Sequence, residues 1–348
     1  MAGTSNALTD DEIERRAAML RGIVDNVDRV IVGKHRQVSL VVAALVAGGH
    51  VLLEDVPGTG KTSLVRALAR SVDCTFSRIQ FTPDVMPSDV CGFSLFNQKS
   101  REFEFRPGGV MANLVLADEI NRASAKTQSA LLEAMEERQV TVDSVTHRMA
   151  EPFMVLATQN PVEEFGTYPL PEAQLDRFLI RLSLGYPTRE EEIRVVMGSR
   201  AAKATIEPVA SGADVVAARE AAGRVHASEA VVGYAVDIVE ATRRDERFSR
   251  GASPRASLAL VDLARAWALM HERGYMLPDD VKLLAPYVLA HRVSLAFSDE
   301  GADGSSDAGS AVHDEVERLV AGVPVPMEND RADATSSSDA GTGEHRAR

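Results

Sequence analysis

The sequence predicts an α/β fold, a parallel sheet flanked by helices, followed by an all-α domain. Two patterns support this prediction. Short β-rich runs alternate with helical stretches from residue 51 to residue 182, and strands that alternate with helices form parallel sheets. From residue 186 onward, the apolar residues recur almost entirely at helical spacing.

Each element follows from a local pattern. Thr9 is predicted to cap a first helix, whose apolar face carries Ile13, Ala17, Leu20, Val24 and Val27. A second helix is expected at residues 37–47. The β-rich runs are 51–53, 75–81, 114–117, 153–158 and 178–182, and the helical stretches among them are 61–71, 124–136 and 172–176. Two stretches that alternate apolar and polar residues predict inserted β-hairpins at 93–106 and 139–149.

The predicted domains follow from these elements. They are an N-terminal helix at 1–28, an α/β core with two hairpins at 29–185, a helical domain at 186–326 and a tail at 327–348. Helices of the second domain are expected at 190–200, 213–226, 230–244, 254–271, 280–291 and 312–320. Residues 299–311 lack periodicity and predict a flexible loop, and the acidic tail reads as disordered.

Composition narrows the class of protein. The net charge of −13 disfavours nucleic acid as a partner, because proteins that bind its phosphates usually present a basic face. Cys74 and Cys91 do not make a disulfide framework. We find neither a signal-like stretch nor the ~20 apolar residues of a membrane span. These features predict a cytoplasmic protein without a membrane span.

The most informative stretch is the glycine-rich run 55–62, which lies between an apolar strand and a helical pattern. There, Gly58 and Gly60 let successive backbone N–H groups point at one anion, and the helix N-terminus adds positive partial charge. Lys61 is expected to reach the β- and γ-phosphates, and the Thr62 hydroxyl to bind Mg²⁺. Asp55 stands where the strict pattern has glycine, so its carboxylate must turn away from the phosphates.

Two further strands are predicted to end in polar residues at the same edge of the sheet. Asp118 would hold Mg²⁺ through water, and Glu119 would orient and deprotonate the attacking water. Alone, this pair could be two solvated acids; the phosphate loop upstream favours the catalytic interpretation. Asn160 follows the strand at 153–158 and could hydrogen-bond the γ-phosphate or the water.

Two arginines are candidates for charge stabilisation. Arg177 lies at a helix-to-strand junction and could act as an arginine finger, or form a salt bridge within the fold, for example to Asp176. Arg255 follows Ser253, a predicted cap, and Pro254 in the first turn of a helix. A cation there opposes the helix dipole, so either an anion relieves it or the side chain points to water.

Together these motifs resemble the AAA+ ATPases and, within them, the MoxR family, over about residues 30–326. The most specific pieces are the segments 53–58, 116–123, 157–161, 172–178 and 253–255. The departure at Asp55 looks like a common MoxR variant.

The resemblance implies the cofactors ATP and Mg²⁺ and a role for each motif. Lys61 and Thr62 match Walker A, Asp118 and Glu119 Walker B, Asn160 sensor 1, Arg177 a finger that acts in trans, and Arg255 sensor 2. The implied catalytic residues are Glu119, Lys61, Asn160, Arg177 and Arg255, and the implied metal ligands are Thr62 and Asp118. The implied nucleotide-binding residues are Ile31, Val32 and Gly33 beside adenine, then Pro57, Gly58, Thr59, Gly60, Lys61, Thr62, Ser63 and Asp118.

The resemblance also implies a ring, usually hexameric, that acts on a protein client, often with a partner bearing a von Willebrand factor A domain. We therefore expect an ATPase that remodels or matures other proteins. Two alternatives stay open. One is a DNA-acting motor such as a helicase loader, in which Arg138, His147 and Arg148 of a hairpin would meet phosphates. The other is a nucleotide-gated binding module with little hydrolysis.

Overall fold

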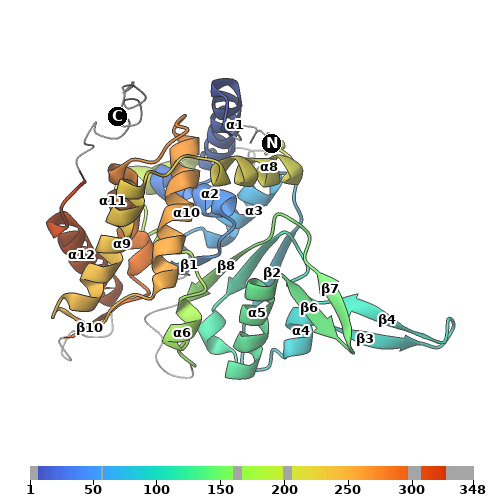
Figure 1. The fold of residues 1–348 in the computed structure, drawn as a ribbon. Helices are drawn as coiled ribbons and strands as arrows, with labels where there is room; N and C mark the ends of the chain where they lie inside the picture. The colour runs from blue at the N-terminus through green and yellow to red at the C-terminus, as the bar shows by residue number, and fades with distance from the viewer. Residues whose placement is uncertain (1–6, 56–57, 160–166, 199–205, 297–306, 327–348) are drawn as a thin grey trace, which may run out of the picture.

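A five-stranded parallel sheet forms the centre of the molecule (Figure 1). The computed structural model describes residues 7–55, 58–159, 167–198, 206–296 and 307–326. The strand order is β2-β5-β8-β1-β9, and every neighbouring pair is parallel. The strands are β1 (Val51–Glu54), β2 (Phe76–Gln80), β5 (Leu114–Asp118), β8 (Met154–Gln159) and β9 (Ile180–Leu182). The predicted parallel sheet is confirmed.

Both faces of the sheet are buried, as expected for parallel strands with helices on each side. Successive side chains alternate between two hydrophobic clusters: Leu53 and Leu116 enter one, while Leu52 and Val115 enter the other. Because β1 lies between β8 and β9, the loop that follows β1 leaves the sheet's carboxyl edge with a strand on either side.

The helices of the core precede β1 or lie between the strands along the chain. They are α1 (Asp10–Asp28), α2 (His35–Ala47), α3 (Lys61–Ser71), α4 (Pro87–Cys91), α5 (Ala125–Glu137) and α6 (Glu172–Leu175), with a 3₁₀ turn at Ile120–Arg122. Thr9 caps α1 by accepting a hydrogen bond from the Glu12 amide, as predicted. Helix α2 begins two residues before the predicted start at residue 37. Helix α4 was not predicted from the sequence.

Both predicted hairpins are present. One pairs β3 (Gly92–Asn97) with β4 (Glu102–Pro107), and the other pairs β6 (Gln139–Val142) with β7 (Val145–Arg148). Figure 1 shows the β3–β4 hairpin projecting away from the rest of the molecule, beside β6 and β7. The rings of Phe105 and His147 stack with centroids 3.7 Å apart, so the two hairpins contact each other.

The second half of the chain is helical, with one small exception. Its helices are α7 (Arg189–Gly198), α8 (Gly212–Gly223), α9 (Glu229–Arg244), α10 (Pro254–Met270), α11 (Pro278–Leu289) and α12 (Asp307–Gly322). An unpredicted antiparallel pair joins β10 (Phe248–Arg250) to β11 (Ser294–Leu295). Because α12 begins at Asp307, residues 307–311 are helical and the prediction of a flexible loop is wrong there. The rest of that loop and the tail at 327–348 lie outside the described residues.

The core of these helices is continuous with that of the α/β domain. A single hydrophobic cluster joins them to α1, α2 and one face of the sheet, through residues such as Leu20, Leu40, Leu53 and Leu260. Helix α2 is buried along nearly its whole length, so it needs cover on every side, and α10 packs against it. Among the described residues, no helix is long and apolar enough to cross a membrane.

Candidate active site

A cavity of about 340 Å³ lies at the carboxyl edge of the sheet. Parallel strands direct their carboxyl ends to the same edge, where ligands of such folds gather. The cavity is lined by Asp55, Gly58, Gly60, Lys61, Thr62, Ser63, Arg78, Gln80, Asp118, Glu119 and Thr158. The structure therefore brings the phosphate-loop residues and both predicted acids together.

The phosphate loop has the backbone geometry that an anion cradle needs. Gly58 and Gly60 both have φ of +92°, a left-handed conformation that favours glycine. Gly60 is the N-cap of α3, so the positive end of that helix faces the cavity. The Lys61 Nζ atom donates to the Asp55 carbonyl at 2.8 Å. Pro57 lies outside the described residues, and Thr59, although within the loop, is not among the residues that line the cavity.

Asp55 turns away from the cradle, as its position required. Its carboxylate accepts hydrogen bonds from the Ser183 hydroxyl at 2.8 Å and from the amides of Leu184 and Gly185 at 2.8 and 2.9 Å. The side chain is buried, and these three donors satisfy it. Asp55 thus fastens the end of β1 to the segment that leaves β9.

Asp118 and Glu119 end β5 in a connected network. The Thr158 hydroxyl, on the neighbouring strand β8, donates to Asp118 Oδ1 at 2.7 Å and accepts from the Glu119 amide at 2.8 Å. The other oxygen, Asp118 Oδ2, accepts from Arg78 at 2.6 Å. Glu119 has φ of +57°, a strained conformation for a residue with a side chain. Thr158 therefore holds both acids at the sheet edge.

Gln80, at the end of β2, connects the two acids on their other side. Its Oε1 accepts from Arg78 at 2.5 Å, and its Nε2 donates to Glu119 Oε2 at 3.0 Å. Glu119 Oε2 also lies 3.2 Å from Arg122 Nη1. A cation bound at Asp118 would replace Arg78 or share the carboxylate with it, which would disturb the same network that holds Glu119.

The predicted adenine side lies where the core meets the lid. A Cβ atom on Gly60 would lie 3.9 Å from Ile31 Cδ1, so Ile31 borders the phosphate loop. Gly33 has φ of +78°, and the side chain of Glu191 in α7 covers it so closely that a Cβ atom would clash. Val32 is half-buried. Of the three, Ile31 borders the loop, and none of them lines the cavity itself.

The two predicted arginines lie together, but not at this cavity. Arg177 Nη2 lies 2.9 Å from Glu136 Oε2, and Arg255 Nη2 lies 3.8 Å from Glu136 Oε1. Arg177 therefore does not pair with Asp176. Ser253 occupies the cap position of α10 but makes no capping hydrogen bond; its hydroxyl donates to Asp176 Oδ2 at 3.0 Å. Asn160 lies outside the described residues.

Comparisons with known proteins agree with this geometry. Residues 50–180 match the family "ATPase family associated with various cellular activities (AAA)", and residues 240–314 match the AAA lid domain. Chaperone MoxR1 of Mycobacterium tuberculosis is 45% identical over 80% of this chain and 76% of its own. The chain belongs to the MoxR family of AAA+ ATPases.

Other relatives support this assignment. The uncharacterized protein YeaC of Bacillus subtilis is 54% identical over 80% of this chain and 87% of its own. The crystal structure of an ATPase candidate from Cytophaga hutchinsonii superposes with a TM-score of 0.81 and 36% identity, covering 91% of this chain and 98% of that one. The AAA+ core with a helical lid thus extends over most of the MoxR chain.

The MoxR family implies ATP and Mg²⁺, and the residues present fit both. A Cβ atom on Gly58 would meet nothing within 4 Å, so the cradle opens into free space. The hydroxyl of Thr62 and the carboxylate of Asp118 line one cavity and supply the oxygen ligands that Mg²⁺ prefers. Lys61 adds a positive charge beside them.

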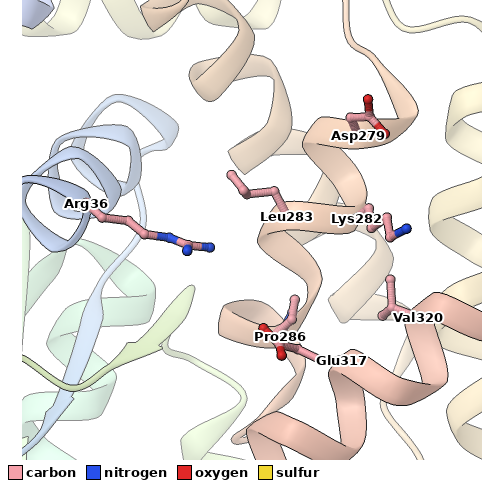
Figure 2. Close-up of a pocket in the computed structure, with 7 residues that line it drawn as sticks. All are labelled: Arg36, Asp279, Lys282, Leu283, Pro286, Glu317 and Val320. Atoms are coloured by element: carbon pink, nitrogen blue, oxygen red, sulfur yellow. The ribbon is translucent and has the colours of Figure 1, made fainter.

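A second cavity, of about 410 Å³, lies between α2, α11 and α12 (Figure 2). Its lining mixes both signs of charge, with Arg36 and Lys282 near Asp279 and Glu317. None of the predicted site residues line it. We therefore assign the chemistry to the smaller cavity at the sheet edge.

Three residues that line the site, Arg78, Gln80 and Thr158, were not predicted from the sequence, nor was Glu136, the partner of the two arginines. Gln80 and Thr158 could have been found, because each lies at the carboxyl end of a predicted strand, the position that singled out Asp118. No sequence signal marks Glu136, which lies among other glutamates on α5.

Proposed function

We propose that this MoxR protein is a Mg²⁺-dependent ATPase that hydrolyses ATP in a cytoplasmic, ring-shaped oligomer and uses the cycle to remodel a protein client. One observation carries the proposal: the phosphate cradle and the two acids of β5 line a single cavity. The proposed units are the core at 29–185 and the lid at 186–326.

In the proposed reaction, the loop amides and Lys61 hold the β- and γ-phosphates. Glu119 accepts a proton from the attacking water, after release from Gln80, and general-base assistance contributes roughly 10²–10⁴-fold. Asn160 orients that water or the γ-phosphate. Mg²⁺ held by Thr62 and Asp118 would neutralise charge on the phosphate oxygens.

The site is proposed to be completed by a neighbouring copy. Arg177 and Arg255 converge on Glu136 instead of lining their own cavity, which supports a role for Arg177 at the site of the next subunit. A hexamer is the ring size that we propose from the family. An arginine supplied in trans contributes roughly 10³–10⁵-fold to turnover.

Mixing two inactive variants tests this arrangement. Arg177→Ala keeps its own phosphate loop but lacks the finger, whereas Lys61→Ala keeps the finger but lacks the loop lysine. We expect each variant alone to hydrolyse ATP poorly and the mixture to recover turnover, measured as phosphate release. If Arg177→Ala alone turns over like wild type, the trans finger is wrong.

A protein client is favoured over DNA. The β3–β4 hairpin exposes Phe93, Leu95, Phe96 and Phe103, and such apolar surface fits a protein partner. The hairpin cations proposed for DNA include Arg138, which binds the Gly48 carbonyl, and His147, which stacks on Phe105. Stimulation of turnover by duplex DNA at low salt would instead favour the DNA motor.

We further propose a partner with a von Willebrand factor A domain.

A further inference from the structure

The segment that carries Arg177 is held by a buried arginine of the lid. Arg292 follows α11 and is 5% exposed. Its Nε donates to Asp176 Oδ1 at 2.7 Å. Its Nη1 donates to the carbonyls of Leu179 and Val288 at 3.2 and 2.6 Å, and its Nη2 to those of Asp176 and Phe178 at 3.2 and 2.6 Å. All five N–H groups of the guanidinium therefore have an oxygen partner.

A second part of the lid holds the same segment. The Ser253 hydroxyl donates to Asp176 Oδ2 at 3.0 Å, and Ser253 directly precedes α10, whose first turn carries Arg255. His291 Nε2 lies 2.9 Å from the Phe178 carbonyl. The residue before Arg177 is thus fastened to the end of α11 and to the start of α10.

Stability alone does not explain a buried, fully bonded guanidinium. Removing two charges from water is costly, and apolar side chains of similar volume often stabilise a core at least as well. This arginine instead provides orientation, because its planar guanidinium holds several oxygen atoms in fixed positions at once. Here four of the five hydrogen bonds go to oxygens of residues 176–179, which flank the proposed finger on both sides, and the fifth goes to the Val288 carbonyl of α11.

We propose that Arg292 is a positioning residue that couples the orientation of the lid to the placement of Arg177. The inference rests on the proposed function, in which Arg177 completes the site of a neighbouring copy. A lid that shifts with the nucleotide state would carry Arg292 and Ser253 with it. The segment 176–179 would follow, and the guanidinium of Arg177 would move toward or away from the neighbouring site.

The test compares Arg292→Lys with Arg273→Lys. Arg273 also forms a bidentate pair within the lid, with Asp280 at 2.6 Å through both nitrogens, but it does not touch residues 176–179. We expect Arg292→Lys to lower kcat by about 10²-fold with little change in KM, since displacing a catalytic group by about 1 Å has that effect. Arg273→Lys should retain the wild-type kcat.

Mixed assemblies separate positioning from general damage. Lys61→Ala subunits supply intact fingers, so adding them to Arg292→Lys should restore turnover at the variant's own loops. Ser253→Ala, which removes one hydrogen bond and leaves the core filled, should show a smaller loss of kcat with the same rescue, and it carries the test if Arg292→Lys does not fold. A folded Arg292→Lys with wild-type kcat, or a loss that is not rescued, would overturn the inference. Arg177→Ala is measured in parallel: wild-type turnover in that variant would refute the trans finger itself.

Discussion

Asp55 illustrates how a single residue can depart from a motif and still serve it. The generic phosphate loop has glycine at this position, and a carboxylate facing the phosphates would repel them. The buried carboxylate instead accepts three hydrogen bonds from residues 183–185. The carboxylate therefore connects the end of β1 to the segment that follows β9.

Replacing Asp55 should cost stability without improving the site. Asp55→Ala leaves the buried amide of Leu184 and the half-buried amide of Gly185 without an acceptor, so we expect the free energy of unfolding to fall by about 3 kcal/mol. Urea denaturation measures this, with Asp237→Ala, an exposed position on α9, as the control. If Asp55→Ala binds ATP more tightly and keeps its stability, the carboxylate faces the phosphates after all.

At the scale of elements, His50 connects β8 to α5. The Val155 amide donates to Nδ1 at 3.0 Å, so Nδ1 carries no proton, and Nε2 lies 3.1 Å from the Met135 carbonyl, to which it donates. Burial lowers the pKa of His50 from 6.5 to about 4. Protonation would place two N–H groups against each other, so the folded state keeps this histidine neutral.

This contact predicts how stability depends on pH. Between pH 6.5 and 4 the unfolded chain binds a proton at His50 that the folded chain does not, so stability is complete above 6.5 and is lost as pH falls. From pH 7.5 to 5, His50 should account for about 2 kcal/mol of that loss. Urea denaturation of His50→Gln should show a correspondingly shallower dependence, while the exposed His271→Gln should match wild type. Equal pH dependence in all three proteins would contradict the prediction.

Elements with strong local signals could be predicted from sequence, whereas long-range pairings could not. The loop glycines and the start of α3 are set by adjacent residues, and the apolar strands predict a sheet edge where Asp118 and Glu119 meet. The strands β10 and β11 are only 3 and 2 residues long, too short for a periodic pattern. Arg177 was weighed as a partner of Asp176, but Asp176 pairs with Arg292, a residue 116 positions away that no local pattern connects to it.

At the scale of the whole molecule, the lid is continuous with the core. The hydrophobic cluster that includes Leu20, Leu53 and Leu260 joins α1, the sheet and α10, so a shift of the lid is expected to act on the core packed against it. The hydrogen bonds from Arg292 and Ser253 to residues 176–179 lie within this shared region. A change at the nucleotide is therefore expected to reach the surface that carries Arg177, and through it the neighbouring copy.

The central claim is that ATP bound by the loop of Gly58–Thr62 is hydrolysed with Glu119 as the base. Glu119→Gln tests it most directly, measured for ATP binding and for turnover on the same preparation, with Glu137→Gln, exposed on α5, as the control. We expect wild-type affinity for ATP and a loss of turnover of roughly 10²–10⁴-fold. Wild-type turnover in Glu119→Gln would contradict the account.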